Sequence, residues 1–386
     1  MVCVMAAWLG AAHAQEPDYI IQSNSAPLIP IGVAPPTASA VHVPAPPAPA
    51  SAPVAPSAPS APVAVQASAP AQPPETMQPV VHKIRIGLLL PTSSPSLGDA
   101  AQVVRAGFEA AAATDGTAEV VNVDEQESNV VQRYRTTVAS GVKVMVGPLT
   151  RQGIASIVPY VSVPTLALNA VEPGLPAKSK LLSLSLTVEG EARQMARMMH
   201  DDGRTSPLVV SAGDVLSQRL TQAFSQEWQK QTGSAPVVLA WPATTPLADA
   251  VKSADSVFVA MSADDAAALK PTLPDALTVY ATSQLNTRNP VPALAGIRFI
   301  DMPWFLMPDQ TEVKHYPRPA SPLTVQTERL YALGIDAYRI ALMMSNGKWS
   351  VANMHLHGVT GDLKLAHDRQ FERTLPLAVM MPAAAQ

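Results

Sequence analysis

From Lys83 onward, short apolar runs alternate with longer stretches in which apolar residues recur at helical spacing. The run from Ile84 to Leu90 is apolar almost throughout, as is typical of a strand buried on both faces of a parallel sheet. The stretch that follows, 97–113, has the periodicity of a helix packed on one side. The pattern therefore predicts repeated strand-helix units.

The same pattern continues to the end of the chain. In the first series we expect strands at 84–90, 120–123, 142–146 and 165–168 and helices at 97–113, 129–139 and 150–158. In the second we expect helices at 187–200, 217–230 and 263–269 and strands at 207–210, 237–241, 256–260, 278–281 and 297–302. A long amphipathic helix at 325–344 and a hairpin of 362–365 with 371–375 complete the prediction.

Two strand-helix series predict an α/β fold with two Rossmann-like lobes, each a parallel sheet covered by helices on both faces. About 300 residues suit two such lobes better than one core. We expect lobe 1 to comprise 83–186 plus 303–346, and lobe 2 to comprise 187–302 plus 350–380, joined by crossover strands. Ligands of such sheets bind at the carboxyl ends of the strands.

Composition separates the N-terminal part from this region. The chain has 39 prolines in 386 residues, and most of the excess lies between Pro27 and Pro79. Proline removes backbone donors and fixes φ, so we expect 15–80 to be a disordered Pro/Ala-rich linker. Extended polyproline II would rise about 3.1 Å per residue there.

The first fourteen residues have the features of a secretory signal peptide. An apolar run from Val2 to Ala12 precedes a small-x-small cleavage site, Ala12-His13-Ala14. Because the first basic residue is Lys83, we expect the true start to lie upstream of Met1. Cys3 follows Val2 and precedes the apolar run, which favours an ordinary signal-peptide cysteine over a lipidated one. As the only cysteine, it leaves no expected disulfide or thiolate metal site.

Charge and motifs narrow the function. The net charge of −4, from 26 basic and 30 acidic residues, argues against nucleic acid as the main partner. No G-x-S-x-G elbow, Walker loop or G-x-G-x-x-G motif is present, so we expect no enzyme and no cofactor. Asp264 and Asp265 open a predicted helix, where carboxylates offset the helix dipole. We expect Asp124, Glu125 and Glu127 to form a solvated loop.

His355 and His357 are the one local pattern that points to a metal. Two histidines at i and i+2 on a strand share a face and could bind zinc. His367 lies ten residues further on, and the local run supplies no carboxylate at ligand spacing. We therefore predict a solvated strand face and no metal.

Several motifs in a fixed order resemble a known family. They are Ile86–Pro91 with Ala101–Phe108, Val146–Leu149, Pro164–Asn169, Glu191–Gln194, Phe299–Phe305, Leu333–Arg339, Gly358–Leu365 and Glu372–Pro376. The opening motifs resemble the type I periplasmic-binding-protein fold, and the set resembles the penicillin-binding protein activator family of the LpoA/LppC type.

The resemblance implies an accessory protein in the envelope of a Gram-negative bacterium. It further implies that the folded domain contacts a class A penicillin-binding protein, the peptidoglycan synthase, and stimulates it. Two departures matter. The helical-repeat N-terminal domain of enterobacterial members is replaced by the proline-rich segment, and no convincing lipobox supports the outer-membrane anchoring of those members. We therefore expect a periplasmic protein, with outer-membrane association left open.

Two functions remain open, and each has candidate residues. In solute-binding relatives the loops after the first, third and fourth strands line the cleft, and here they hold Thr92, Ser93, Ser94, Thr150 and Asn169. Hydroxyls and helix N-terminal amides can hold a carboxylate, as a binding protein for amino acids or small cell-wall fragments would require. Turn and capping roles explain the same residues.

A protein partner would use a different surface. The proline-bounded stretch 302–308 contains Trp304, Phe305 and Met307, residue types enriched at binding hot spots. The same stretch could instead be buried as packing at the hinge between the lobes.

Overall fold

The computed structural model describes residues 83–126, 128–172, 174, 179–242, 247–289 and 291–382. The expected signal peptide at 1–14, the linker at 15–80 and Glu127 lie outside the described residues. Among the residues described, no helix is both long and apolar enough to span a bilayer.

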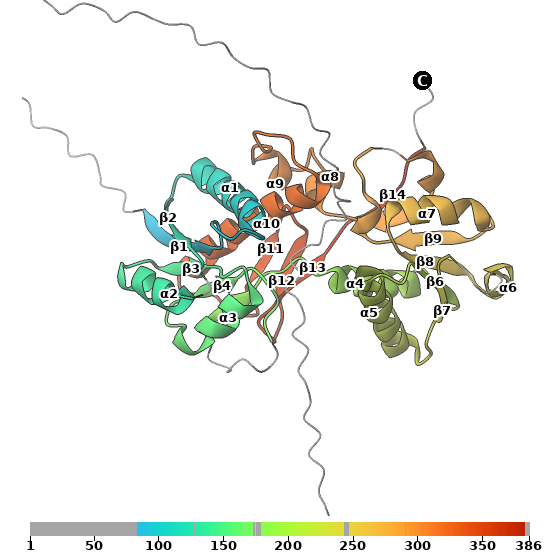
Figure 1. Cartoon of the computed structure of the whole chain (residues 1–386), viewed down its shortest axis with the longest axis horizontal. Helices are drawn as coiled ribbons and strands as arrows, with labels where there is room; N and C mark the ends of the chain where they lie inside the picture. The colour runs from blue at the N-terminus through green and yellow to red at the C-terminus, as the bar shows by residue number, and fades with distance from the viewer. Residues whose placement is uncertain are drawn as a thin grey trace, which may run out of the picture. The chain divides into compact units, whose positions relative to one another are not determined.

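The first sheet has five parallel strands in the order β2-β1-β3-β4-β5 (Figure 1). Its strands are β1 (Ile84–Leu90), β2 (Ala118–Asp124), β3 (Val144–Val146), β4 (Thr165–Ala167) and β5 (Leu181–Ser183). The associated helices are α1 (Gly98–Asp115), α2 (Val130–Ala139), α3 (Arg151–Ile157) and the 3-10 turn η1 (Val158–Tyr160). The last five residues of β1 are buried, which confirms the prediction of a strand covered on both faces.

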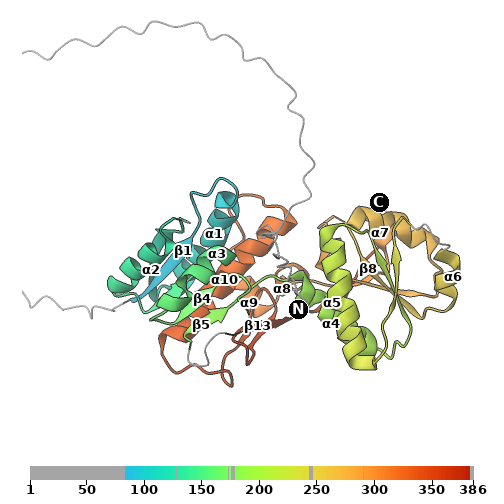
Figure 2. The same ribbon diagram turned by 60° about the horizontal axis from the view of Figure 1, so that its bottom comes forward.

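The second sheet has six strands in the order β14-β10-β9-β8-β6-β7, and Figure 2 shows helices on its faces. Its strands are β6 (Pro207–Ser211), β7 (Val237–Ala240), β8 (Ser256–Ala260), β9 (Thr278–Ala281), β10 (Arg298–Ile300) and β14 (Leu377–Val379). The helical segments are α4 (Val188–Asp201), α5 (Val215–Thr232), α6 (Leu247–Lys252), α7 (Ala263–Leu269), η2 (Lys270–Thr272), η3 (Ser283–Leu285) and η4 (Pro292–Leu294). Only the pairing of β14 with β10 is antiparallel in this sheet as described.

A third, antiparallel sheet is built from β11 (His355–His357), β12 (Asp362–Leu365) and β13 (Phe371–Thr374). The predicted hairpin is confirmed as β12 and β13, and the solvated strand predicted at His355 and His357 is β11, which pairs with β12. Leu363 and Leu365 are buried while Lys364 between them is exposed, so one face of this sheet packs inward and the other faces solvent. A bridge between Ser183 and Gln370 links the sheet to the first one.

The longest helix of the described residues is buried in the protein rather than lying on its surface. α10 (Val325–Ser345) follows the short helices α8 (Pro303–Leu306) and α9 (Thr311–Lys314) and packs along α1 (Figure 1). Every residue from 328 to 338 is buried, so the expectation of an amphipathic helix is wrong. A helix buried on all sides is a core helix, and its polar residues must find partners inside the protein.

The contact between α1 and α10 depends on two glycines. A Cβ added at Gly107 would collide with the carbonyl oxygen of Tyr331, and one added at Gly334 would collide with the carbonyl oxygen of Val104. The two helix backbones are therefore in direct contact at positions where only glycine fits. This contact fixes α10 to the first sheet through α1.

We propose that lobe 1 comprises 83–186 with 303–346, and lobe 2 comprises 187–302 with 350–380. The packing of α10 on α1 supports the return of the chain to lobe 1. The pairing of β14 with β10 supports its return to lobe 2. The third sheet contacts both, through the bridge at Ser183 and through the packing of β13 on α4.

Candidate cleft and partner-binding site

Thr92 and Ser93, at the end of β1, are held by a carboxylate of the protein itself. The Thr92 hydroxyl donates to Asp124 Oδ1 at 2.9 Å, the Ser93 amide donates to the same oxygen at 3.0 Å, and the Ser93 hydroxyl donates to Oδ2. Burial raises the pKa of the Asp124 carboxyl, but these hydrogen bonds outweigh it and hold that pKa below its ordinary value. Asp124 therefore stays ionised, and its carboxylate accepts the hydrogen bonds of these three donors.

Glu125 does the same for the loop after β3. Its carboxylate accepts the Leu149 amide at 2.8 Å, the Thr150 amide at 3.3 Å and the Thr150 hydroxyl. The Thr150 hydroxyl oxygen also caps α3 by accepting the Gly153 amide at 2.9 Å. A Cβ at Gly153 would collide with Glu125, so glycine makes room for the carboxylate. Glu125 is buried, and the prediction of a solvated loop is wrong for it.

The remaining cleft candidates also bond within the protein. The Asn169 side chain donates to the Leu149 carbonyl at 3.1 Å and accepts the Ala170 amide at 2.8 Å. The Ser94 hydroxyl accepts the Leu97 amide at 3.3 Å, as a turn residue does. A pocket beside Asn169 has a volume of about 50 Å³, far below the 300 Å³ or more that small-molecule sites usually offer. That volume holds a few waters and no amino acid.

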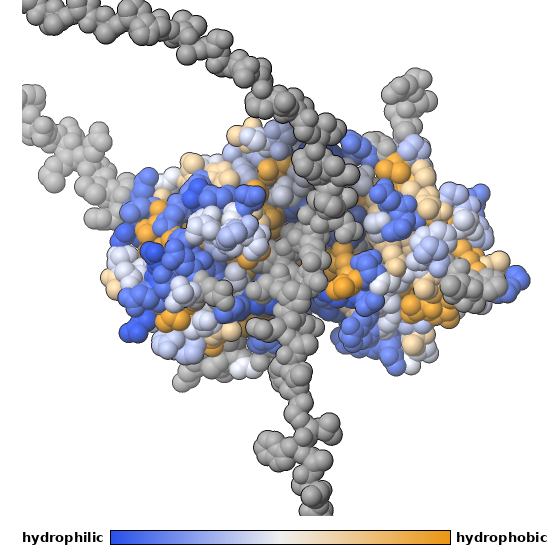
Figure 3. All heavy atoms as spheres, in the orientation of Figure 1, coloured by the Kyte–Doolittle hydropathy of each residue, from blue (hydrophilic) through white to orange (hydrophobic). Residues whose placement is uncertain are grey.

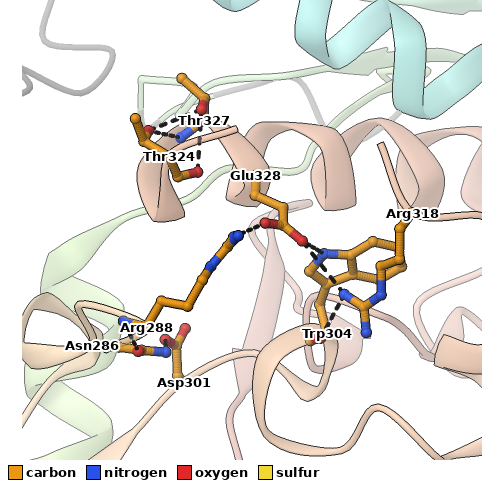
Figure 4. A network of polar contacts seen from close by, with 8 residues as sticks. All are labelled: Asn286, Arg288, Asp301, Trp304, Arg318, Thr324, Thr327 and Glu328. Atoms are coloured by element: carbon orange, nitrogen blue, oxygen red, sulfur yellow. Dashed lines mark hydrogen bonds and ion pairs between the residues drawn. The ribbon is translucent and has the colours of Figure 1, made fainter. Parts of the chain in front are cut away.

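Trp304, in α8, is fully buried at the base of a larger pocket. Its indole Nε1 donates to Glu328 Oε1 at 2.8 Å, and the Arg318 guanidinium lies 3.9 Å from its ring centroid (Figure 4). Arg318 also donates to the Trp304 carbonyl at 2.9 Å. The indole is therefore fixed in position by a hydrogen bond from one edge and a cation on one face.

Two arginines share the single carboxylate of Glu328. Arg288 forms an ion pair with Oε2, and Arg318 lies 3.5 Å from Oε1, as the dashed lines in Figure 4 show. Burial lowers the pKa of Arg318, and the nearby charge of Arg288 lowers it further. Both guanidinium groups remain about half exposed. Because two arginines face one carboxylate, these three side chains have a net charge of one positive unit.

A strained loop presents Arg288 to this site. Its φ of +67° lies in the left-handed region, which is unusual for a residue with a Cβ. The Arg288 amide donates to Asn286 Oδ1 at 3.0 Å, and Asn286 in turn donates to Asp301 at 2.7 Å. Such strain persists only where the surrounding structure holds it, and here it aims a cation at the pocket.

The pocket has a volume of about 350 Å³, and its wall combines these charged groups and Ser321 with apolar side chains. It is lined by Arg288, Trp304, Phe305, Arg318, Pro319, Ser321, Pro322, Leu323 and Glu328. Of the three predicted partner contacts, the structure places Trp304 in the core, Phe305 half-buried on the pocket wall and Met307 exposed beyond it. We name this group of residues the Trp304 pocket.

Apolar side chains are also exposed on both edges of the second sheet. Val237 and Val238 lie on β7, and Leu377 and Val379 lie on β14. Figure 3 shows apolar patches on this part of the molecule, on the right of the view. Exposed apolar edge strands are surfaces to which another chain can add.

Other sequence predictions have clear outcomes. Asp264 and Asp265 lie in the first turn of α7, where the Ser262 side chain caps the helix, which confirms their structural role. The helix expected at 187–200 is α4, and its N-cap residue Thr187 makes no side-chain capping bond.

The architecture is that of type I periplasmic binding proteins, two parallel-sheet lobes connected by several chain crossings. A structure titled as a putative branched-chain amino acid ABC transporter from Chromobacterium violaceum superimposes with a TM-score of 0.74 at 55% identity, covering 77% of this chain and all of that one. The C-domain of LpoA from Haemophilus influenzae, described as a regulator of PBP1A, superimposes with a TM-score of 0.65 at 26% identity, over 77% of this chain and 97% of that domain.

The family model described as "LppC putative lipoprotein" matches residues 58–252 and 245–379, and the chain belongs to this family. Among curated proteins, the penicillin-binding protein activator LpoA of Haemophilus influenzae is 28% identical over 312 residues, and that of Histophilus somni strain 129Pt is 26% identical over 309. Each alignment covers 75% of this chain, and the chain spans about half the length of these relatives, 53% and 52%.

Proposed function

We propose that this protein is a non-enzymatic regulator in the periplasm of a Gram-negative bacterium, and that it binds and activates a class A penicillin-binding protein. The names of the curated relatives and of the LpoA C-domain structure support this proposal. Association with the outer membrane is part of the same proposal.

One observation favours this proposal over solute binding: carboxylates of the protein itself bond to the polar groups of the cleft loops. In a solute-binding protein, the amides and hydroxyls at these loops must be free to take the ligand. Here Asp124 and Glu125 bond to those of Ser93 and Thr150. A free amino acid would have to displace two buried or ionised carboxylates, at a cost of several hydrogen bonds.

Activation by binding requires a difference in affinity between two states of the synthase. A regulator that binds the active state ten times more tightly than the inactive state shifts their ratio tenfold, which corresponds to about 1.4 kcal/mol. A modest surface is sufficient for such a difference. The exposed Met307, two residues after Phe305 of the Trp304 pocket, is our proposed contact.

We expect the purified protein to bind the class A synthase of the same bacterium and to raise its rate of glycan polymerisation. Met307→Asp places a charge at the proposed contact and should weaken binding at least about tenfold, the effect of losing a moderate hot spot. Binding is measured by pull-down and by titration, and polymerisation with lipid-linked substrate. The same titration with Tyr160→Asp, an exposed residue of η1, should match the wild type.

Absence of binding at micromolar concentrations would contradict the whole proposal. Equal weakening by both substitutions would contradict only the location of the contact.

The alternative function, solute binding, is supported by the similarity to the Chromobacterium violaceum structure of a putative branched-chain amino acid ABC transporter. If the cleft binds branched-chain amino acids, leucine at one hundred times its dissociation constant should stabilise the protein by about 2.7 kcal/mol. We expect no change in melting temperature with leucine, isoleucine, valine or muropeptides up to millimolar concentration, measured by thermal shift. A saturable rise with any of them would show that the cleft opens to a ligand.

A further inference from the structure

We propose that His355, His357 and Asp362 form a binding site for a single Zn²⁺ ion on the solvent face of the third sheet. The histidines lie on β11 and the aspartate begins β12, directly opposite His357 in the antiparallel register. One ligand atom from each of the three side chains lies within 4.8 Å of the other two. None of these residues belongs to the cleft or to the Trp304 pocket.

The geometry is close to that of a three-ligand zinc site. His355 Nε2 lies 2.9 Å from both Asp362 carboxylate oxygens, and His357 Nδ1 lies 2.7 Å from Oδ1. Ligand atoms about 2.0–2.1 Å from a tetrahedral zinc ion are roughly 3.3 Å apart. Small side-chain rotations that widen these contacts by about half an ångström are sufficient to admit the ion.

The donor set suits zinc among the common divalent ions. Two imidazole nitrogens and one carboxylate oxygen are typical zinc ligands, and a water would complete the tetrahedron because the site opens to solvent. The ion requires each imidazole to turn a lone pair toward it. The proton of His355 then lies on Nδ1 and that of His357 on Nε2.

The turn between the two strands holds the ligands in register. The Gly358 amide donates to the Gly361 carbonyl at 2.8 Å. The fully buried carboxylate of Asp336 accepts the Val359 amide at 3.0 Å and the Thr360 amide at 2.8 Å. Because the turn is fixed to α10 in this way, His357 and Asp362 face each other before any ion binds.

Neighbouring charges on the same face nearly cancel. The register places Lys364 opposite His355 and Glu372 opposite Lys364, so one cation and one further carboxylate flank the three ligands. The opposite face, with Leu363 and Leu365, is buried. The site is therefore accessible to an ion from solvent, and the core does not depend on it.

The test uses the full chain after treatment with a chelator and dialysis. Titration with ZnCl₂ against a chromophoric zinc indicator should show a site in the wild type that Asp362→Asn and His357→Ala each weaken at least about tenfold, since even residues that only orient ligands give tenfold effects. His367→Ala should bind as the wild type does. Co²⁺ should give a visible absorption band with tetrahedral intensity in the wild type and not in Asp362→Asn.

Asp362→His separates ligation from the ion pair. It removes the carboxylate but offers a third imidazole, so it should retain zinc where Asp362→Asn does not. Melting curves in EDTA confirm that each variant is folded. If wild type and Asp362→Asn bind zinc equally, or if zinc binds neither, the three residues are a solvated ion pair and the proposal is wrong.

Discussion

Replacing Gly334 by alanine should lower the free energy of unfolding by about 3 kcal/mol, the upper part of the range for overpacked cores. The added Cβ would meet the Val104 carbonyl oxygen and come within 2.7 Å of the Phe108 amide nitrogen. Both are backbone atoms of α1, so no side-chain rotation relieves the clash, and the helices must separate. A folded domain is stable by only about 5–15 kcal/mol, so this is a large fraction.

The matched control is Gly190→Ala, the same chemical change in the first turn of another helix, α4. Its Cβ would lie 3.2 Å from the Thr187 hydroxyl oxygen, which can rotate away. Alanine is a better helix former than glycine, so this variant should be as stable as the wild type or more so. Urea denaturation followed by circular dichroism measures both. An equal loss in the two variants would show that the contact of α1 and α10 is not the cause of the loss at Gly334.

Elements whose burial comes from continuous apolar runs were predicted well from the sequence. The predicted strands at 84–90 and 256–260 coincide with β1 and β8, because every residue in such a run satisfies both faces of a parallel sheet. The short strands β5 and β14 were not predicted, and the strand predicted at the two histidines of β11 was given no bounds or partner. Three residues carry too little pattern, and their pairing partners lie elsewhere in the chain.

Buried charges explain why the prediction of an amphipathic helix is wrong for α10. Its polar residues Glu328, Arg329 and Asp336 are buried. Each instead has a partner from a distant segment: Glu328 binds Trp304, Arg329 binds Asp301, and Asp336 binds the turn at Thr360. Sequence spacing within one helix carries no information on such partners.

The candidate sites show the same limit. The loops around Ser93 and Thr150 follow β1 and β3, but the carboxylates that bond to them were assigned to solvent. Asp362 was passed over as a companion of His355 and His357 because ligand spacing was sought in the local run. Only the pairing of β11 with β12 brings it between them.

Asp301 and Arg329 are the buried ion pair that joins α10 to the second sheet. Arg329 Nη2 donates to Asp301 Oδ2 at 2.8 Å and to the Ser283 carbonyl at 2.9 Å, and Asp301 is fully buried at the end of β10. Asp301 also accepts the Asn286 amide group at 2.7 Å, which links the pair to the loop of Arg288. The pair therefore connects α10 of lobe 1, as we assign it, with the sheet of lobe 2 and with the Trp304 pocket.

Arg329→Met should lower the free energy of unfolding by about 3–5 kcal/mol, because it leaves the Asp301 carboxylate charged and buried without its cation. Adding Asp301→Asn should recover part of that loss, since a neutral amide carries no such penalty and can still accept from Asn286. Lys252→Met breaks the exposed pair with Asp249 and should cost no more than about 1 kcal/mol. Urea denaturation of the four proteins measures these differences. If the double variant is less stable than Arg329→Met, the uncompensated charge is not the cause, and the hydrogen bonds of Asp301 hold the junction together.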